Sequence, residues 1–333
     1  AVDRAGEVPQ PVPTPSTGKR VAVVGGGPSG LSAAYYLSLM GHKVTVYEKR
    51  RQLGGMMRYG IPSYRFPREK LDGEIRSILS LGIEVHTEVD IGGDLTLEQL
   101  RGQYDALYLS IGAHTDKKVG IEGEDAIGVM SAVDMLRHIG DNEMPDFTGM
   151  NVAVIGGGNT AMDAARAAIR SGAASATLVY RRTKRYMPAD AEELELAMAD
   201  GVRFLELAAP VAQENGRLKC ERMTLGAPDE KGRRSPLPTG ELMEFDCDTV
   251  IAAVGEQVEG ELFTANGIAV NAKDIPGFCT NLENVYVGGD AMRGPATVVE
   301  GIADAQRFAD IVIGAPHTLS VPENAHVTRE EAI

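Results

Sequence analysis

Short apolar runs and helical patterns alternate near the start of the chain. Residues 21–24 (VAVV) predict a buried strand, because a short β-branched run is typical of one. Residues 31–40 have a helical pattern that stops at Gly41, and residues 43–47 (KVTVY) predict the next strand. A strand–helix–strand unit of this kind pairs its strands in parallel through a right-handed crossover.

The same unit recurs near the middle of the chain. Residues 151–155 (NVAVI) and 176–180 (ATLVY) predict strands, with a helix at 160–171 between them. Each unit carries a glycine-rich loop between its first strand and its helix, beginning at Gly25 and at Gly156. Because the unit occurs twice and not in a long series, the pattern predicts two α/β domains of one type and excludes a solenoid.

The first loop has the pattern G-x-G-x-x-G. Gly25 permits a tight turn, Gly27 lets the backbone approach a pyrophosphate, and Gly30 lets the helix pack on the strand. The helix N-terminus offers free N–H groups to phosphates, and Glu48, at the end of the second strand, can accept hydrogen bonds from ribose hydroxyls. The residues alone do not separate FAD from NAD. The predicted dinucleotide-binding residues are Gly25, Gly27, Pro28, Ser29, Gly30, Glu48 and Lys49.

The second loop has the related pattern G-x-G-x-x-A. At the end of its second strand, the carboxylate is replaced by basic residues, which suit a 2′-phosphate. This half of the chain therefore predicts NADPH, although NADH stays open because a guanidinium can also stack on adenine. The residues concerned are Gly156, Gly158, Asn159, Thr160 and Ala161 in the loop and Arg181, Arg182, Lys184 and Arg185 after the strand.

Composition limits the classes of function. The chain has 333 residues, of which 43% are apolar and 24% charged. This length suits about two domains. With 33 basic and 47 acidic residues the net charge is −14, so no general attraction for nucleic acid or an anionic membrane is expected. No apolar run reaches the roughly 18 residues of a membrane span.

The cysteines and histidines do not form a redox or metal-binding pattern. Cys220, Cys247 and Cys279 are too few and too scattered for a disulfide framework, a CxxC pair or an iron–sulfur cluster within this chain. Such cysteine usage predicts a reducing, cytoplasmic compartment. The six histidines have no metal-ligand spacing, so no metal site is predicted, and His114 is interpreted as a turn residue rather than a base.

Longer phrases carry a resemblance to a known family. They are VAVVGGGPSGL, YEKRRQLGGMMRYGIPSYRFP, LYLSIGAH, VAVIGGGNTAMDAA, VYRRTKRYMPA, VIAAVGE and NVYVGGDAMRGPATVVEGIADAQ. In order and spacing they resemble the FAD- and NADPH-binding part of the glutamate synthase small subunit family. That family includes the related half of dihydropyrimidine dehydrogenase and the flavin subunits of some electron-bifurcating complexes. The resemblance covers residues from about 1 to 315.

The resemblance implies a set of cofactor contacts. The first loop would bind FAD with Glu48 on the adenosine ribose, and the second loop NADPH with Arg181 and Arg182 on the 2′-phosphate. From the residues alone, Asp290 could equally cap a turn. Residues implied near the flavin, pyrophosphate or ribityl chain are Gly54, Gly55, Met56, Arg65, Gly112, Gly289 and Asp290. The backbone N–H groups implied at the flavin N1/O2 edge are those of Ala296, Thr297 and Val298, and the residues implied at the hinge are Ala253, Val254 and Gly255.

The implied fold has two Rossmann-like dinucleotide-binding domains of the pyridine nucleotide-disulfide-oxidoreductase type. The second domain is inserted into the first, because FAD-type phrases flank the second loop on both sides. The expected boundaries are 19–125 and 257–315 for the FAD-binding domain, 126–256 for the NADPH-binding domain, 1–18 for a linker and 316–333 for a tail. The family usually carries an N-terminal iron–sulfur domain, which is missing here. Either the chain is a fragment, or the electron outlet lies on another chain.

The implied reaction is hydride transfer from the nicotinamide C4 of NADPH to N5 of FAD. Electrons would then pass to an iron–sulfur domain or partner subunit, with a larger catalytic subunit also expected. Because the reaction needs rings stacked about 3–3.5 Å apart and no acid, base or nucleophile, no catalytic side chain is predicted. The alternatives are a non-catalytic flavin-binding scaffold and the flavin subunit of an electron-bifurcating complex. A disulfide reductase of the same fold is disfavoured by the absence of CxxC.

Overall fold

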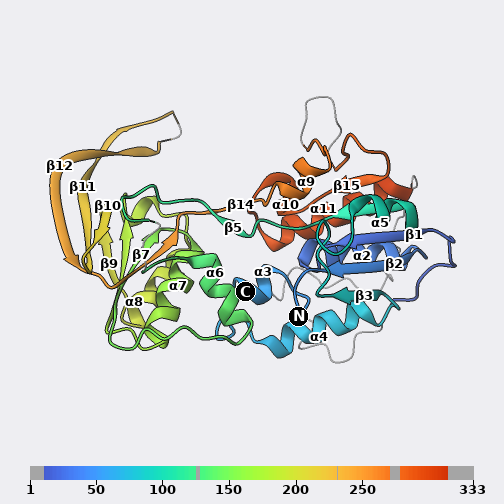
Figure 1. The fold of residues 1–333 in the computed structure, drawn as a ribbon, viewed down its shortest axis with the longest axis horizontal. Coiled ribbons are helices and arrows are strands. Elements are labelled where there is room, and N and C mark those ends of the chain that lie inside the picture. The colour runs from blue at the N-terminus through green and yellow to red at the C-terminus, as the bar shows by residue number, and fades with distance from the viewer. Residues whose placement is uncertain (1–10, 125–127, 231, 271–277, 314–333) are drawn as a thin grey trace, which may run out of the picture.

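The chain forms two lobes, each built on a five-stranded parallel sheet (Figure 1). The computed structural model describes residues 11–124, 128–230, 232–270 and 278–313. The expected tail at 316–333 and the first part of the expected linker lie outside the described residues. The remainder of that linker runs along the first lobe, where the Thr14 N–H donates to the Leu39 carbonyl oxygen at 2.8 Å. The predicted α/β class with two parallel sheets is confirmed.

The first lobe is discontinuous in sequence. Its strands are β1 (Arg20–Val24), β2 (Lys43–Glu48), β3 (Glu84–Thr87), β4 (Ala106–Leu109) and β15 (Val285–Val287), in the sheet order β15-β4-β1-β2-β3. Its helices are α2 (Pro28–Leu39), α3 (Met56–Tyr59), α4 (Arg68–Leu79), α5 (Leu97–Gln103), α9 (Glu261–Ala265), α10 (Asp290–Arg293) and α11 (Val298–Ile313). Strand β15, at the edge of this sheet, therefore comes after the whole of the second lobe in the sequence.

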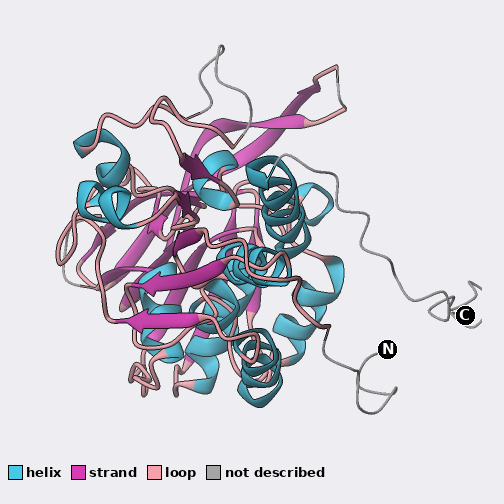
Figure 2. Cartoon of the chain, turned by 90° about the vertical axis from the view of Figure 1, so that its right-hand side faces the viewer, coloured by secondary structure: helices cyan, strands magenta, loops and turns pink. Residues whose placement is uncertain are grey.

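Helices cover both faces of the first sheet. Helices α2, α4 and α11 pack on one face, where Val23, Leu37 and Phe308 are fully buried. Helices α5, α9 and α10 cover the other face, around Leu107 and Leu109. Figure 2 shows helices in cyan on both sides of the magenta strands. With both faces covered, the carboxyl ends of the strands become the edge at which ligands bind in sheets of this kind.

The second lobe has a sheet of the same type with a different cover. Its strands are β6 (Val129–Ser131), β7 (Asn151–Gly156), β8 (Ser175–Tyr180), β9 (Arg203–Glu206) and β13 (Thr249–Ala253), in the order β6-β13-β7-β8-β9. One face is covered by α6 (Ala132–Gly140), α7 (Asn159–Arg170) and α8 (Ala191–Ala199), and a short 3-10 helix, η1 (Lys184–Tyr186), follows β8. Buried alanines on α7, such as Ala164 and Ala168, let this helix lie close to the sheet.

A three-stranded antiparallel sheet covers the other face of the second lobe. It consists of β10 (Ala208–Glu214), β11 (Arg217–Pro228) and β12 (Arg234–Asp246), and the last two extend away from the lobe (Figure 1). The hydrophobic pattern of the sequence did not predict this sheet. The sequence carried a signal for it in the Asn215-Gly216 pair. Both residues have the positive φ, 51° and 72°, that a two-residue hairpin turn requires. Leu218 and Cys220 then point inward between exposed neighbours.

Both helices that follow glycine loops begin earlier than their periodicity predicts. Helix α2 begins at Pro28 and not at residue 31, with Gly27 as its N-cap. Proline is tolerated there because the first helical N–H groups have no partner within the helix. Helix α7 begins at Asn159, with Gly158 as its N-cap. Both loops therefore end directly in a helix N-terminus.

The chain crosses between the lobes on two short strands, β5 (Thr115–Asp116) and β14 (Glu256–Gln257), which pair antiparallel. After β5 the chain already lies against the second lobe, because Glu122 exchanges backbone hydrogen bonds with Val211 and Gln213 of β10. The predicted boundary at 125/126, which itself lies outside the described residues, is therefore too late. Packing on β10 leaves no mark in the local sequence pattern.

Candidate dinucleotide-binding sites

The glycines of the first loop have different roles. Gly25 has φ +106°, and a Cβ there would lie 2.4 Å from the Ser110 carbonyl oxygen. A Cβ at Gly30 would lie 1.9 Å from the Gly25 carbonyl oxygen. Packing therefore requires these two glycines whatever the loop binds. A Cβ at Gly27 would meet only the Gly55 Cα, at an ordinary 3.6 Å, so Gly27 keeps the space in front of α2 empty.

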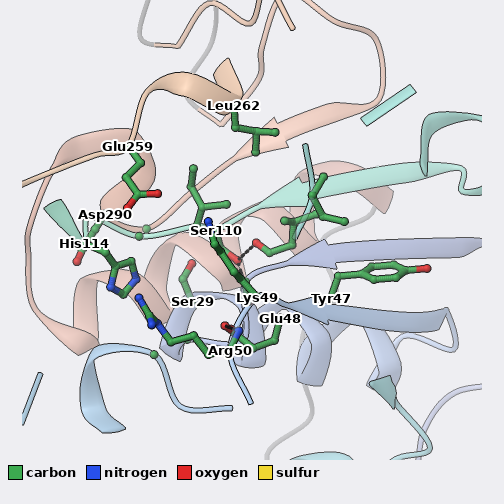
Figure 3. A pocket seen from close by; sticks show the side chains of 18 of the residues that line it. Ser29, Tyr47, Glu48, Lys49, Arg50, Ser110, His114, Glu259, Leu262 and Asp290 are labelled. Carbon is green, nitrogen blue, oxygen red and sulfur yellow. Dashed lines mark hydrogen bonds between the residues drawn. The ribbon is translucent and has the colours of Figure 1, made fainter. Parts of the chain in front are cut away.

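A cavity of about 950 Å³ opens at the carboxyl ends of the first sheet (Figure 3). Its wall includes residues that follow each of the five strands. Arg137, on α6 of the second lobe, lines it as well, so both lobes contribute to the wall. The predicted cofactor-binding residues that line the cavity are Gly25, Gly27, Pro28, Ser29, Glu48, Lys49, Gly55, Met56, Gly112, Gly289, Asp290, Ala296, Thr297 and Val298.

Two glycines of the predicted set lie outside the cavity wall. Gly30 packs against Gly25, as described above. Gly54 has φ +126°, and its N–H donates to the Gly26 carbonyl oxygen at 2.8 Å. A Cβ at Gly54 would lie 3.0 Å from the Leu71 side chain. Gly54 therefore shapes the turn that brings its neighbour Gly55 to the cavity.

Arg65 is placed differently from its predicted position. It was expected near the flavin or the pyrophosphate, but it does not line the cavity. Its guanidinium forms ion pairs with Asp163 and Glu193, on α7 and α8 of the second lobe. No local pattern could have revealed these partners, because both lie about a hundred residues or more further along the chain.

Glu48 is fixed beside the first glycine loop. Glu48 is buried, with 8% of its surface exposed, and it is the last residue of β2. One carboxylate oxygen accepts the Gly26 N–H at 2.7 Å and the other accepts the Arg50 N–H at 2.8 Å. Burial raises the pKa of Glu48, and these backbone N–H groups oppose the rise. Each carboxylate oxygen keeps a second acceptor site, so Glu48 can accept hydroxyl donors from a ribose.

The residues after β15 form another part of the wall. Gly289 has φ +62°, and its N–H donates to Asp304 of α11 at 3.2 Å. Asp304 is fully buried and pairs with Arg293. An oxygen of Asp290 accepts the Ala296 N–H at 3.1 Å, and burial raises the pKa of Asp290 to about 6. Asp290 therefore closes this turn and also faces the cavity.

The N-terminus of α11 meets the cavity directly after this turn. The Thr297 N–H donates to the Glu300 carboxylate at 2.9 Å, and the Glu300 N–H donates to the Thr297 hydroxyl at 3.3 Å. This reciprocal pair is a capping box, which fixes where the helix begins. The positive end of the helix dipole therefore lies at the cavity wall, where it favours a negative group.

His114 also lines the cavity, although the sequence indicated only a turn residue. Figure 3 places it on the same side of the cavity as Arg50. Burial, with the positive charges of Arg50 and Arg137, lowers the pKa of His114 to about 4, so the imidazole is neutral near pH 7. Its place just after a strand that ends at the cavity edge was the signal that could have found it.

The cavity fits the predicted FAD. Its volume of about 950 Å³ lies at the upper end of the usual range for ligand pockets. The backbone at Gly27 is bare where a pyrophosphate would approach, and Glu48 supplies ribose acceptors. Helix N-termini, of α2 and of α11, lie at its wall.

The second glycine loop repeats the division of roles found in the first. A Cβ at Gly156 would lie 2.2 Å from the Ala253 carbonyl oxygen, so packing requires this glycine. A Cβ at Gly158 would meet nothing within 4 Å. Ala161 is fully buried and takes the position that Gly30 has in the first loop. Open space therefore lies in front of α7 as it does in front of α2.

The other predicted residues of this loop and of the hinge are held by specific contacts. Asn159 and Asp190 exchange two hydrogen bonds, of 3.3 and 3.1 Å. The Thr160 hydroxyl donates to Glu256 of β14 at 2.8 Å, which ties the start of α7 to the link between the lobes. Ala253 ends β13, and Val254 and Gly255 connect it to β14, at the position predicted for the hinge.

The basic segment after β8 folds back over the second loop. The Tyr180 ring covers Gly157, whose carbonyl oxygen accepts the Ala189 N–H at 3.1 Å. Between these two contacts, Arg181 and Arg185 are exposed, while Arg182 is half-buried and donates to the Arg234 carbonyl oxygen at 3.2 Å. The predicted phosphate-binding cations thus project from a segment that begins and ends at the glycine loop.

The part of the chain that the structure describes has neither a cluster of metal-binding side chains nor a membrane-spanning helix. No group of three or more His, Cys, Asp or Glu side chains in that part of the chain could hold a metal ion. Within the same residues, no helix has the length and apolar character needed to cross a membrane.

Residues 19–305 match the pyridine nucleotide-disulphide oxidoreductase family, and the chain belongs to this family. The solved structure of FprA from Mycobacterium tuberculosis in complex with NADPH has a TM-score of 0.76 and 23% sequence identity, over 90% of this chain and 84% of that chain. This likeness and the family match confirm the predicted fold of two Rossmann-like domains.

Relatives with higher sequence identity place the chain in a smaller group within this family. The NADP(+)-dependent formate dehydrogenase subunit beta of Moorella thermoacetica is 40% identical over 307 residues, 88% of this chain and 43% of that protein. The NADPH glutamate synthase small chain of Escherichia coli K12 is 33% identical over 320 residues, 88% of this chain and 68% of that one. The chain spans about half the length of the first curated relatives it matches. The resemblance to the glutamate synthase small subunit family is confirmed.

Family membership also confirms the predicted class of enzyme and its cofactors. Members of this family are oxidoreductases that bind FAD and NAD(P)H. The two glycine loops and the cavity of the first lobe are the features of this chain that correspond to that pair of dinucleotides.

Proposed function

We propose that the chain takes hydride from NADPH at the second glycine loop and delivers it to FAD in the cavity of the first lobe. The electrons then pass to an iron–sulfur partner. One observation carries the proposal. Each loop has a middle glycine, Gly27 or Gly158, whose bare backbone faces open space before a helix N-terminus. Packing does not require a glycine at either position, whereas a pyrophosphate would.

The cavity residues would hold FAD along its length. The pyrophosphate would lie at Gly27 and the N-terminus of α2, with the adenosine ribose on Glu48 and the ribityl chain near Asp290. The backbone N–H groups at Ala296 to Val298 would face the N1/O2 edge, where the α11 dipole stabilises negative charge and raises the reduction potential. When bound, FAD supplies the hydride acceptor at N5 and an electron outlet.

The second loop would hold the nicotinamide nucleotide in the same manner. Its pyrophosphate would lie at Gly158 and the N-terminus of α7, and its 2′-phosphate at Arg181, Arg182 and Arg185. Charge-assisted contacts to a phosphate are roughly twice as strong as neutral hydrogen bonds, so these cations favour NADPH over NADH. The names of the two relatives described above also refer to NADP(+) or NADPH.

The side chains of this chain position the reactants and exchange no proton with them. His114 lines the cavity, but its lowered pKa keeps the imidazole neutral near pH 7, so it is not a cationic acid there. Arg137 lines the cavity from the second lobe. The work of the protein is to bring two rings into contact at a fixed orientation.

The electron acceptor is proposed to lie outside this chain. A four-cysteine iron–sulfur cluster needs more cysteines than the three present. Several relatives are named as a beta subunit or a small chain, which indicates a partner subunit in those proteins. An iron–sulfur domain or subunit is the partner that accepts electrons singly from a reduced flavin.

Anaerobic stopped-flow absorbance tests the proposal. The purified chain is expected to be yellow, and chromatography of its released cofactor identifies the flavin. NADPH should bleach the oxidised flavin band in a single turnover, and NADH should do so with a much weaker affinity. If the flavin is present and neither nucleotide changes its absorbance, the chain is a flavin-binding scaffold and the proposal is wrong.

A further inference from the structure

The segment between α3 and α4 carries an arginine that reaches the second lobe. Arg65 Nη1 lies 2.5 Å from an Asp163 oxygen on α7, and Arg65 Nη2 pairs with Glu193 on α8. One guanidinium of the first lobe therefore bridges two helices of the second. We call these three residues the Arg65 bridge.

The Arg65 bridge is largely shielded from water. The side chain of Asp163 is 4% exposed and that of Glu193 is 14% exposed. Arg166, also on α7, lies 3.6 Å from the second Glu193 oxygen. Removing one partner from a buried pair leaves an uncompensated charge, so such a pair strongly favours the one arrangement in which both partners meet.

The neighbouring residue adds a second contact with the same helix. The Tyr64 ring lies beneath the guanidinium groups of Arg166 and Arg170, at 5.0 and 4.3 Å from its centroid. Cations at such distances are attracted to the face of an aromatic ring. Both arginines are held by Asp200, at 2.8 and 2.9 Å. Adjacent residues of the first lobe thus fix α7 at two points.

Helix α7 is the helix that begins at the second glycine loop. Asp163 lies one turn from its first residue, so the Arg65 bridge acts close to the proposed NADPH site. Two further contacts join the lobes. One is the β5–β14 link, and the other packs α6 on α3, where a Cβ at Gly140 would lie 2.8 Å from the Arg58 carbonyl oxygen. In Figure 1, the link and α4 lie on opposite sides of the junction.

We propose that Arg65 is a positioning residue for flavin reduction, because its bridge to Asp163 and Glu193 holds the NADPH lobe in the orientation that hydride transfer requires. The inference rests on the proposed function. The β5–β14 link and the packing of α6 on α3 restrain the lobes, and the bridge adds ion pairs that fix α7 and α8 against the segment before α4. In the same orientation, Arg137 of the second lobe lines the FAD cavity.

Single-turnover reduction of the FAD-loaded protein by NADPH measures the effect. For Arg65→Gln, we expect the limiting rate of flavin reduction to fall roughly tenfold or more, because small misplacements of reacting groups cost that much. The Kd for NADPH should change by less than about threefold, since the proposed nucleotide contacts are untouched. The limiting rate of flavin reduction for Arg65→Lys should lie between those of the wild type and Arg65→Gln, because an ammonium cannot span both carboxylates as a planar guanidinium does.

Small-angle X-ray scattering gives a readout that does not depend on turnover. Loss of the bridge should increase the radius of gyration, because the lobes are then restrained only by the β5–β14 link, the packing of α6 on α3 and the contact of Tyr64 with α7, among the contacts described above. Arg65→Gln leaves two buried carboxylates without their cation. The variant Arg65→Gln/Asp163→Asn/Glu193→Gln, which keeps the side-chain sizes without the charges, is therefore measured beside it.

The matched control is Arg76→Gln, which removes the same charge from an exposed position on α4 of the same lobe. The inference holds if the bridge variants lose rate and change scattering while the control does neither. A folded bridge variant with wild-type rate and scattering overturns it, and so does a faster rate. If NADPH fails to reduce the flavin of the wild-type protein, the proposed function is wrong, and scattering alone then decides whether the bridge fixes the lobes.

Discussion

At the scale of single residues, the two loops separate glycines needed for packing from glycines that leave room for a ligand. Gly25, Gly30 and Gly156 would bring a Cβ within 2.5 Å of a carbonyl oxygen. Gly27 and Gly158 would not, and both have extended backbone at the N-cap of a helix. The G-x-G pattern predicted these positions. The pattern also predicted the role of each glycine in the first loop, and the structure adds which atoms a Cβ would meet at each position.

This difference predicts a reciprocal pair of variants. Gly27→Val should give folded protein without FAD, because the new side chain occupies the proposed pyrophosphate site and meets only the Gly55 Cα in the protein itself. Gly158→Val should give folded, yellow protein whose flavin NADPH no longer reduces. Circular dichroism reports folding, and absorbance reports the flavin.

Each of the two variants is the control for the other. Gly25→Ala should fail to fold, since packing excludes a side chain there whether or not FAD is present. Full FAD occupancy in Gly27→Val would contradict the assignment of the pyrophosphate.

The basic segment after β8 predicts a change of nucleotide preference. Arg181→Ala with Arg182→Ala should raise the KM for NADPH about tenfold or more, because each charge-assisted phosphate contact contributes roughly 1.5–3 kcal/mol. The KM for NADH should change much less, since NADH has no 2′-phosphate. Steady-state kinetics with an artificial acceptor measures both.

Arg222→Ala removes a charge from the antiparallel sheet, where Arg222 pairs with Glu241 at 2.8 Å, and should change neither constant. Equal effects of the double variant on NADPH and NADH would mean that the segment does not recognise the 2′-phosphate.

The residues that the sequence did not predict share one property. Arg137 and the partners of Arg65 take their places through contacts between segments far apart in the chain. The predicted loop residues and Glu48, by contrast, belong to a local strand–turn–helix pattern. Local geometry could be predicted from the sequence, and tertiary pairing could not.

At the scale of elements, the β-α-β units were predictable because their apolar runs are short and bounded by glycine. The antiparallel sheet was missed because its strands expose many polar residues and alternate only in part. Its Asn-Gly turn was the stronger signal. The helix starts were displaced because Pro28 and Asn159 stand before the first apolar positions of their helices.

Helix α7 carries a buried carboxyl that predicts a pH dependence. Burial raises the pKa of Asp163 to about 6, against Arg65 and Arg166, and Glu193 adds to the rise. The folded chain therefore binds a proton that the unfolded chain, with a carboxyl pKa near 3.9, has lost. The raised pKa of Asp163 stabilises the folded protein by roughly 3 kcal/mol below about pH 4. This contribution is lost as the pH rises through about 6.

Urea unfolding of wild-type protein and Asp163→Asn between about pH 4 and 8 measures this effect. The free energy of unfolding of wild type minus that of the variant should fall across the range. Glu192→Gln, on the exposed side of α8, should leave the profile unchanged. A difference that stays constant or rises with pH would contradict the raised pKa.

At the scale of the whole molecule, the sequence predicted two dinucleotide-binding domains, one inserted in the other. It did not predict how the lobes are oriented, because that depends on the β5–β14 link, the packing of α6 on α3 and the Arg65 bridge. None of these contacts has a periodic or motif signature. Orientation decides whether a nicotinamide and a flavin can meet, so the least predictable feature is the one on which the proposed reaction depends.

The place of β15 in the chain has a consequence for biosynthesis. This strand and the turn that carries Gly289 and Asp290 are translated after every residue of the NADPH lobe. The second lobe therefore emerges complete from the ribosome while the first lobe still lacks an edge strand and part of its cavity wall. The proposed FAD cavity can therefore be completed only after every residue of the second lobe has been translated.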